Sequence, residues 1–222
     1  GPGDAVFTTP FTYVATAEVI SILGATPIFV DVYESTYNID CDKLEIEINK
    51  VIKDGKLKPK AIIPVDLFGL PARYRLIDKI AKKYNLKVIE DAAQSFGGSI
   101  RDRKVGVFGD VAATSFYPAK PLGCYGDGGA IFTNDDDLAE ECKAIRIHGT
   151  KKDKYNSEMI GLNGRLDSIQ AAVLLEKLII FDEELKLRKK VDQLYRNFLN
   201  NAQYHPKDYK SSHALFSIIL GS

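Results

Sequence analysis

Strand-like and helix-like segments alternate along the first part of this chain, and this alternation constrains the fold more than any other feature of the sequence. Short apolar or β-branched runs are typical of strands, and runs with apolar residues at helical spacing separate them. This order predicts an α/β fold with a mainly parallel, mixed sheet and helices on both faces. We predict strands at 6–9, 27–32, 60–65 and 86–90, and helices at 14–23, 41–54 and 73–84.

The rest of the chain continues with fewer strands and a very long helix. For the helix at 41–54, Asp40 is the expected N-cap, and the residues expected to face inward are Leu44, Ile48, Val51 and Ile52. A helix as long as the one we predict at 167–199 usually crosses between domains or lines a subunit interface. The other predicted elements are a hairpin-like piece at 99–106, strands at 110–116 and 129–133, a helix from 135 to about 147, a loop at 148–164, and a strand-like run at 214–220 with no partner after it.

Charge and cysteine content exclude several classes of partner. Lys and Arg together number 30, as do Asp and Glu, so the 222-residue chain has no net charge at neutral pH. A neutral chain offers no electrostatic footprint for nucleic acid or an anionic membrane, which favours a small-molecule partner. Apolar runs such as 178–181 are far too short to cross a bilayer. The three cysteines lack CxxC spacing, which argues against a disulfide framework or a zinc site, so we expect a cytoplasmic protein and no metal.

Lys120 lies between two prolines and is followed by a glycine-rich return, within the stretch Thr114–Gly129. Because the prolines fix the backbone and the loop carries little charge, we expect it to hold the amine still and to lower its pKa from about 10.4 toward neutrality. A neutral amine can form a Schiff base. An exposed lysine in a tight connection explains the loop alone equally well. Cys124 fits a small apolar loop residue better than a nucleophile.

Asp91 directly follows an apolar strand, at the edge of the predicted sheet where ligands collect. A carboxylate at this place is often only a helix N-cap. It can also supply the anion that a cofactor with a pyridine ring needs beside the ring nitrogen, with Gln94 one helical turn on to bond a ring substituent. Ser115 ends the strand before Lys120, where a hydroxyl can reach a phosphate.

Taken together, five ordered motifs resemble the pyridoxal-phosphate-dependent nucleotide-sugar aminotransferases of the DegT/DnrJ family. The resemblance runs over nearly the whole chain. It implies the type I fold of the aspartate aminotransferases, with pyridoxal 5'-phosphate as cofactor. Some members carry histidine in place of the lysine and dehydrate sugars, so Lys120 favours amino transfer. The motifs are GPGD at 1–4, FTYVATA at 11–17, EDAAQSFG at 90–97, SFYPAK at 115–120 and GLNGRLDSIQAA at 161–172.

The resemblance implies a role for each candidate residue of the cofactor site. Lys120 is expected to join the cofactor through a Schiff base and later to shuttle a proton. Asp91 is expected to pair with the ring nitrogen, and Gln94 to contact the ring hydroxyl. Ser115 matches the residue that binds the cofactor phosphate, and Tyr13 matches the aromatic residue that stacks on the ring.

Asn163 and Arg165 are the candidates for a site shared between subunits. Asn163 matches an asparagine that reaches the phosphate site of the neighbouring subunit, which implies a homodimer. Arg165 offers a fork for a substrate carboxylate or diphosphate. An asparagine that caps a loop and an arginine at a helix start would explain both residues without a shared site.

Members of the family extend beyond this chain at both ends, with a Gly-Thr phosphate-binding turn before it and a small substrate-covering domain after it. We therefore expect 1–175 to be most of the large cofactor domain and 176–222 to be an interdomain helix and the start of the small domain. Without the other segments we expect this piece to bind the cofactor poorly and to aggregate. The apolar surface expected to be uncovered includes Leu174, Leu175 and Leu178.

The substrate implied by the resemblance is a sugar nucleotide. Residues 120–129 and 163–167 are similar to those of bacterial enzymes that aminate C3 of a UDP-linked 2-acetamido-3-keto uronic acid for surface polysaccharides such as O-antigen, with glutamate as donor. Aminotransferases acting on 4-keto sugars and a member of the fold without catalysis remain alternatives. A nicotinamide-dependent dehydrogenase would need GxGxxG between its first strand and helix, and no such run exists. His148 fits a solvated surface group better than a base.

Overall fold

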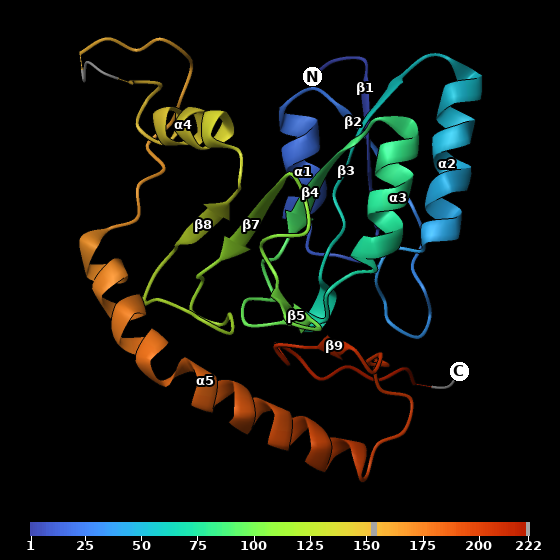
Figure 1. Cartoon of the computed structure of the whole chain (residues 1–222), viewed down its shortest axis with the longest axis vertical. Coiled ribbons are helices and arrows are strands. Elements are labelled where there is room, and N and C mark those ends of the chain that lie inside the picture. Colours follow the sequence, from blue (N-terminus) through green and yellow to red (C-terminus); the bar gives the residue numbers. More distant parts are fainter. Residues whose placement is uncertain (152–154, 221–222) are drawn as a thin grey trace.

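Residues 1–151 and 155–220 are described by the computed structural model, which is built around a six-stranded sheet (Figure 1). The strand order is β2-β1-β3-β4-β7-β8, and every neighbouring pair is parallel except the antiparallel pair of β7 and β8. The predicted α/β fold with a mainly parallel, mixed sheet is confirmed. The strands are β1 (Asp4–Thr8), β2 (Thr26–Phe29), β3 (Lys58–Ile62), β4 (Lys87–Asp91), β7 (Val111–Ser115) and β8 (Gly129–Phe132).

Helices cover both faces of the sheet because side chains alternate along its central strands. Ala5 and Phe7 of β1 pack into a core cluster with residues of α2 and α3, whereas Val6 between them packs with Ile20 of α1. Figure 1 shows α2 and α3 next to each other, apart from α1. These helices are α1 (Ala15–Ile22), α2 (Cys41–Asp54) and α3 (Tyr74–Tyr84).

The order of the strands reverses at β1. The chain passes from β1 through α1 to the edge strand β2, and then through α2 to β3 on the other side of β1. Right-handed crossovers in opposite directions place α1 on one face and α2 on the other. The carboxyl ends of β1 and β3 therefore flank a topological switch point, where open α/β sheets bind ligands.

The C-terminal segment returns to the sheet region after the long helix α5. Three short strands form a second, antiparallel sheet in the order β6-β5-β9, so the predicted hairpin-like piece pairs with a strand more than 100 residues later in the sequence. In Figure 1, α5 crosses below the main sheet and leads to β9 beside β5. The remaining elements are η1 (Leu67–Gly69), β5 (Ser99–Ile100), β6 (Arg103–Lys104), α4 (Asp136–Ile145), α5 (Ser168–Arg196) and β9 (Tyr209–Lys210).

The helix at 41–54 matches its prediction except on one side. Asp40 accepts hydrogen bonds from the backbone N–H groups of Asp42 and Lys43, as expected of an N-cap, and Leu44 and Ile48 are fully buried. Ile52, however, is 51% exposed. It lies one residue past Val51, which packs against the core, so a helical rotation of about 100° turns Ile52 toward solvent.

The final apolar run, 214–220, is not a strand without a partner. The backbone N–H of Ala214 donates to the carbonyl of Phe68 at 3.1 Å, and that of Ile219 donates to the carbonyl of Asn201 at 3.1 Å. One antiparallel bridge joins Ala202 to Ile218. The prediction was wrong because an apolar run alone does not reveal that irregular loops can supply its hydrogen-bond partners.

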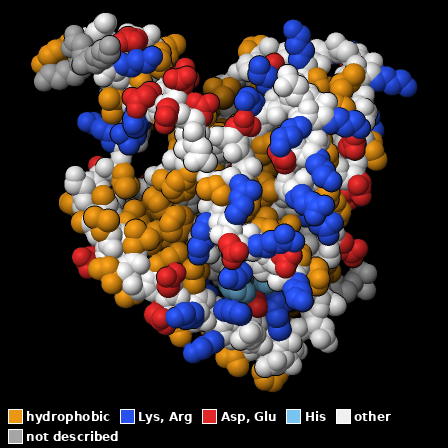
Figure 2. Space-filling model, in the orientation of Figure 1, with side chains coloured by type: hydrophobic (Ala, Val, Ile, Leu, Met, Phe, Trp, Pro, Cys, Tyr) orange, Lys and Arg blue, Asp and Glu red, His pale blue; other side chains and the backbone are white. Residues whose placement is uncertain are grey.

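Apolar side chains remain exposed along α5 and beside β8. Figure 2 shows hydrophobic side chains gathered on a hollowed face there, where a groove of about 1050 Å³ lies between β7, β8 and α4. Leu175 and Leu178 are 65% and 45% exposed, as predicted, but Leu174 is only 5% exposed because it packs against the loop after β7.

Over the described residues no helix has the length and hydropathy to span a membrane. The boundary at 175/176 falls within α5 and stays a prediction.

Candidate active site

Five of the predicted site residues line one cavity of about 240 Å³. They come from the end of β4 and the turn after it, from the end of β7 and the loop after it, and from the segment before α1. The parallel sheet thus brings them together from distant parts of the sequence. This volume lies below the roughly 300–1,000 Å³ of common ligand pockets and suits a ring-sized part of a ligand. The five residues are Tyr13, Asp91, Gln94, Ser115 and Lys120.

The loop that carries Lys120 is fixed by close packing and by α5. A side chain at Gly123 would place Cβ 2.5 Å from the carbonyl oxygen of Pro118, so the turn requires glycine. Lys177 of α5 donates through Nζ to the carbonyl of Gly123 at 2.6 Å. Cys124 is fully buried and donates through Sγ to a backbone carbonyl, which confirms its assignment as a packing residue. Partial burial lowers the pKa of Lys120, as predicted, while the charge of Asp91 opposes that shift.

Asp91 ends β4 and holds its carboxylate in a defined orientation. Oδ2 accepts a hydrogen bond from Thr16 Oγ1 at 2.8 Å, and Oδ1 accepts one from the backbone N–H of Ala93 at 3.2 Å. Burial raises the pKa of Asp91, while those two bonds and the charge of Lys120 lower it. A turn and the strand β5, not a helix, come directly after β4 in the described residues, so the N-cap alternative is wrong.

Gln94 reaches the cavity from a turn, although its predicted spacing from Asp91 assumed one turn of helix. Its side-chain Oε1 accepts a hydrogen bond from the backbone N–H of Phe68 at 2.6 Å, and its own carbonyl accepts one from Ser212 Oγ at 2.7 Å. Anchoring Oε1 leaves the Nε2 hydrogens as donors for a ligand. The C-terminal segment thus helps to position a residue of the cavity.

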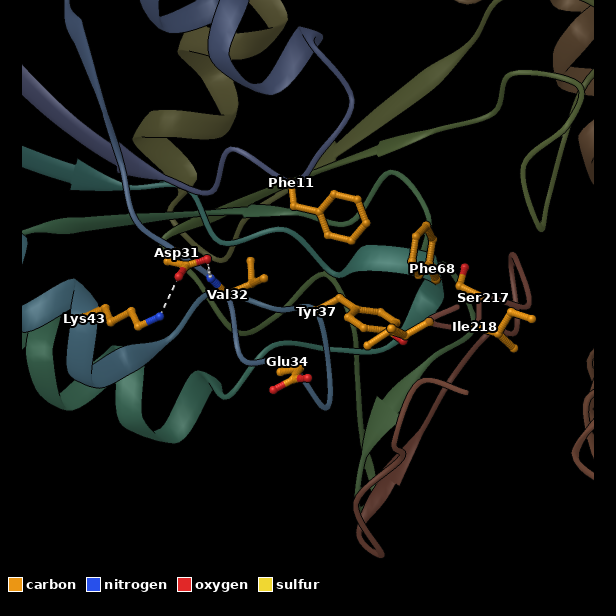
Figure 3. Close-up of a pocket in the computed structure, with 10 residues that line it drawn as sticks. Phe11, Asp31, Val32, Glu34, Tyr37, Lys43, Phe68, Ser217 and Ile218 are labelled. Carbon is orange, nitrogen blue, oxygen red and sulfur yellow. Dashed lines mark hydrogen bonds and ion pairs between the residues drawn. The ribbon is translucent and has the colours of Figure 1, made fainter. Parts of the chain in front are cut away.

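Phe68, whose backbone N–H donates to the cavity residue Gln94, lines a second, larger pocket of about 730 Å³ (Figure 3). The rings of Phe11, Tyr37 and Phe68 meet edge to face there, with centroids 5.9–6.0 Å apart. The ion pair of Lys43 with Asp31, 2.5 Å between Nζ and Oδ2, lies at the other side of the pocket. Aromatic and charged groups therefore lie next to the predicted cofactor site.

Ser115 and Tyr13 lie at the rim of the cavity. The hydroxyl oxygen of Ser115 accepts a hydrogen bond from the backbone N–H of Tyr117 at 3.2 Å, which leaves its hydrogen available to an acceptor. Tyr13 is 71% exposed, although its ring lines the cavity. An aromatic ring this open to solvent is available to stack on a ligand.

Asn163 and Arg165 do not reach the cavity within one chain. Both are exposed, and Arg165 Nε donates to Asn163 Oδ1 at 2.9 Å. The backbone of Asn163 forms a bridge to Ile147, after α4.

His148, in the loop that begins after Ile147, is exposed, in agreement with its assignment as a surface group. Residues 152–154 of that predicted loop lie outside the described residues.

Thr16 is a residue of the site that sequence reasoning missed. It donates to Asp91, and its oxygen is also 2.9 Å from the hydroxyl of Thr12. Because the hydrogen of Thr16 is directed to Asp91, Thr12 is the donor of the second bond. The signal was present in the sequence, since two threonines spaced by four residues at a helix start lie on one side.

Two further carboxyl groups, also missed, are buried behind the cavity. Asp66 accepts hydrogen bonds from Tyr74 and Ser95, at 2.8 and 2.7 Å, and Glu90 accepts one from the backbone N–H of Gly106 at 2.7 Å. Burial raises the pKa of both carboxyl groups. Ser95 adjoins Gln94, so this network fixes the turn that carries a cavity residue.

Comparison with known proteins identifies the group to which this arrangement belongs. The sequence pattern of the DegT/DnrJ/EryC1/StrS aminotransferase family matches residues 1–221. The chain belongs to this family. A solved DegT/DnrJ/EryC1/StrS aminotransferase from Brucella abortus is 51% identical and superposes with a TM-score of 0.94, over 96% of this chain and 58% of that one. The type I aminotransferase fold implied by the resemblance is therefore confirmed.

Two curated relatives differ in what their names describe. The UDP-2-acetamido-2-deoxy-3-oxo-D-glucuronate aminotransferase of Pseudomonas aeruginosa is 52% identical over 195 residues, which are 88% of this chain and 52% of that protein. The pleiotropic regulatory protein of Geobacillus stearothermophilus is 46% identical over 202 residues, 91% of this chain and 52% of that protein. The chain spans about half the length of these relatives.

The cavity fits pyridoxal phosphate, the cofactor of this family's aminotransferases. An amine with a lowered pKa and an oriented carboxylate line the same cavity, which are the groups that the aldehyde and the ring nitrogen of that cofactor require. The amide of Gln94, the hydroxyl of Ser115 and the ring of Tyr13 complete a donor set of suitable chemistry.

Proposed function

We propose that the complete protein is a pyridoxal-phosphate-dependent aminotransferase that delivers an amino group to a keto group of a UDP-linked sugar. The observation that carries this proposal is the presence of the Lys120 amine and the Asp91 carboxylate in one cavity. The identity of 52% to an aminotransferase of this kind supports it. The unpaired cysteines fit a reducing compartment, and we place the enzyme in the cytoplasm.

When bound, the cofactor supplies an electron sink that allows a C–H bond beside nitrogen to ionise. Lys120 would hold it covalently and move the proton, because the lowered pKa leaves more of the amine uncharged at neutral pH. Asp91 would keep the ring nitrogen protonated by its negative charge. The two hydrogen bonds that Asp91 accepts favour the ionised carboxylate, as this role requires.

Three other cavity residues would position the cofactor. Gln94 would donate from Nε2 to the ring hydroxyl, with its orientation set by Phe68. Ser115 would donate its hydroxyl hydrogen to the phosphate, and the ring of Tyr13 would stack on the cofactor ring. All three side chains line the cavity.

The preferred substrate is a UDP-linked 2-acetamido-3-keto uronic acid, with glutamate as amino donor and surface polysaccharide such as O-antigen as destination. The name of the Pseudomonas aeruginosa relative supports the 3-keto position. The name of the Geobacillus stearothermophilus relative keeps a regulatory function as the second candidate. The retained Lys120, Asp91 and Gln94 weigh against that candidate, because regulation alone needs no amine in such a cavity.

Incubation of the full-length enzyme with glutamate and a panel of 3-keto and 4-keto UDP-sugars tests this function. We expect the 3-keto uronic acid to be aminated and 2-oxoglutarate to form in equal amount. Mass spectrometry of the sugar product measures the amination. Exclusive amination of 4-keto sugars would overturn the substrate and keep the reaction. A full-length protein that binds no cofactor and aminates no sugar would favour the regulatory alternative.

We further propose that Asn163 and Arg165 serve the cavity of a second subunit in a homodimer. Both side chains are exposed and polar, so neither is committed to the core of its own chain. Mixing inactive Lys120→Ala subunits with inactive Asn163→Ala subunits should restore activity, because each heterodimer would contain one intact site. Heterodimers that form and stay inactive would contradict the shared site.

A further inference from the structure

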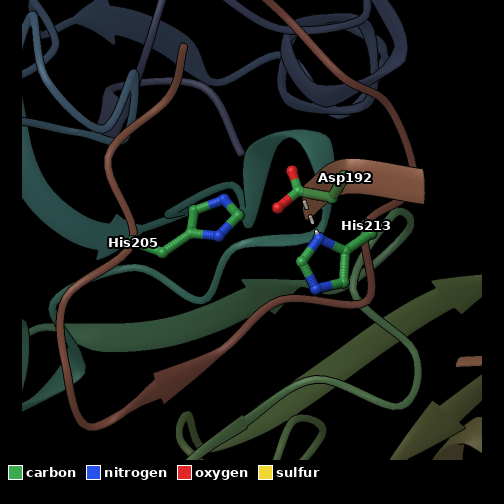
Figure 4. A group of neighbouring side chains, drawn as sticks. All are labelled: Asp192, His205 and His213. Carbon is green, nitrogen blue, oxygen red and sulfur yellow. Dashed lines mark ion pairs between the residues drawn. The ribbon is translucent and has the colours of Figure 1, made fainter. Parts of the chain in front are cut away.

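Outside the cavity, three side chains with metal-binding chemistry converge at the far end of α5. Asp192 lies on α5, whereas His205 and His213 lie on the segment that follows it. One ligand atom from each lies within 4.8 Å of the others. Figure 4 shows Asp192 and both imidazole rings directed toward a common point. No cysteine takes part, so an analysis of cysteine spacing could not find this cluster.

The spacing of these groups is close to that of a zinc site. Zinc–ligand bonds of about 2.0–2.1 Å at tetrahedral angles separate the ligand atoms by about 3.3 Å. His213 Nδ1 lies 3.5 Å from Asp192 Oδ1, and the centroids of the His205 and His213 rings lie 5.4 Å apart. The three donor atoms lie within 4.8 Å of one another, so they would have to approach by up to about 1.5 Å to share a single ion.

His213 Nδ1 is buried and makes no hydrogen bond to the described residues. Its 3.5 Å separation from the carboxylate is long for a hydrogen bond. Most buried polar atoms have a partner, so one without a partner beside two other ligand groups points to a missing ligand.

Both imidazoles of the cluster are partly buried. Burial, reinforced by Arg196, lowers the pKa of His205 to about 4, and burial lowers the pKa of His213. A neutral imidazole has one nitrogen with a free lone pair, and that nitrogen can bind a metal ion. Asp192 is the anion of the cluster, and its pKa is lowered even though it is partly buried.

Arg196 is the group that most constrains this interpretation. It donates to both carboxylate oxygens of Asp192, at 2.7 and 3.1 Å, and its Nη2 lies 3.4 Å from His205 Nε2, which is also 3.4 Å from Gln203 Oε1. Each oxygen has a second lone pair, so a carboxylate can bond a guanidinium and a cation together. Ligating carboxylates in metal sites are commonly held by such a hydrogen-bond donor. The negative charge of Asp192, which contacts Arg196, would reduce the repulsion between Arg196 and a bound ion.

We propose that Asp192, His205 and His213 bind one Zn²⁺ ion, with water as the fourth ligand. The ion would tie the end of α5 to the C-terminal segment. Ser212, next to His213, donates to the carbonyl of Gln94, so the site would also stabilise one wall of the cavity. Its role would be structural, because it is separate from the residues that line that cavity.

Titration of the full-length, tag-free, metal-free protein with Zn²⁺ alone tests this proposal. We expect one ion per chain by calorimetry, no binding of Mg²⁺, and tetrahedral absorption bands when Co²⁺ replaces Zn²⁺. His205→Gln and His213→Asn should each weaken Zn²⁺ binding by about tenfold or more. His148→Ala is the matched control, because it removes the chain's third histidine from an exposed position and should leave binding unchanged.

Circular dichroism of each variant shows whether a loss of binding reflects a loss of fold. If His205→Gln or His213→Asn unfolds, Asp192→Asn gives the same test from α5. Absence of stoichiometric Zn²⁺ binding by the folded wild-type protein would overturn the proposal. Equal Zn²⁺ affinity in wild type and a folded His213→Asn variant would also overturn it.

Discussion

The cavity and the Asp192–His205–His213 cluster are both polar sites, but they are assembled in different ways. Asp91 and Ser115 end neighbouring parallel strands, and parallel strands place their carboxyl ends at one edge of the sheet. The cluster joins α5 to an irregular segment, and no regular element sets the distance between its members. The cavity therefore follows from the sheet, whereas the cluster depends on how the C-terminal segment packs.

The two sites also differ in what their charges do. In the cavity, the opposite charges of Asp91 and Lys120 each partly offset the effect of burial on the other's pKa. In the cluster, Arg196 adds to burial and lowers the pKa of His205 further. In the cavity the charge of each group therefore acts on the pKa of the other, while in the cluster Arg196 and burial both favour a neutral His205.

Lys120→Ala gives the largest expected effect and tests whether the cavity is catalytic. Turnover should fall by more than about 10²–10⁴-fold, because both the covalent link and proton transfer are lost. Borohydride reduction and peptide mapping of the wild-type holoenzyme should find the label on Lys120. Lys143→Ala, which removes an exposed lysine paired with Glu140, should leave turnover unchanged. A label on another lysine would contradict the assignment.

Much of the fold and part of the cavity could be predicted from the sequence, because they depend on regular strands and helices. Asp91 and Ser115 were expected at strand ends, where ligands collect, and the resemblance to the family joined them with Lys120 in one site, as the cavity does. The N-cap Asp40 was predicted because its effect is local. Features that depend on neighbours in the sequence are readable from it.

The features that were missed depend on residues far apart in the chain. Thr16 contacts Asp91 across 75 positions, and the irregular partners of Ala214 have no pattern of their own. Leu174 and Leu175 are adjacent leucines, and only the packing of α5 against the Lys120 loop decides which one is buried. Periodicity indicates that a helix has an apolar side, but not what covers it.

Asp91→Asn tests whether the charge in the cavity has the proposed role. Asparagine keeps the shape of the side chain but removes the anion. An opposite charge at close range shifts a pKa by about 1–3 units, so loss of the anion should lower the pKa of the cofactor ring nitrogen by that amount. The chemical step should then slow by roughly 10–1,000-fold. Because Asp91 raises the pKa of Lys120, its removal should lower that pKa further. Single-turnover kinetics at saturating cofactor and the pH dependence of lysine labelling measure the two effects. An unchanged single-turnover rate would contradict the assignment.

Leu174→Ala compared with Leu175→Ala tests how α5 supports the cavity loop. Leu174 packs in one cluster with Leu122. Its truncation to alanine should therefore lower the free energy of unfolding of the protein by about 2–5 kcal/mol. Leu175 is 65% exposed, and its substitution should change that free energy by no more than about 0.5 kcal/mol. Urea denaturation of both variants measures the difference. Equal losses would show that α5 does not pack on the loop as described.

Thr16→Val has the smallest expected effect and is the most specific test of the cavity's electrostatics. Valine keeps the shape but removes the donor to Asp91 Oδ2, so the pKa of that carboxyl should rise. Hydrogen bonds to charged groups contribute about 1.5–3 kcal/mol, which corresponds to a roughly ten- to hundredfold slower chemical step. Thr12→Val is the matched control, because Thr12 bonds only to Thr16 among these groups and acts on Asp91 indirectly.

Carbon-13 NMR of labelled aspartate, in protein without cofactor, follows the Asp91 carboxyl directly, and single-turnover kinetics follow the reaction. Thr12→Val should raise the pKa of Asp91 less than Thr16→Val, since the bond from Thr16 remains and only its polarisation by Thr12 is lost. If Thr12→Val has the larger effect, the donor that sets the charge of Asp91 has been misidentified. If neither variant shifts the pKa of the carboxyl, burial, the charge of Lys120 and the backbone N–H of Ala93 determine it.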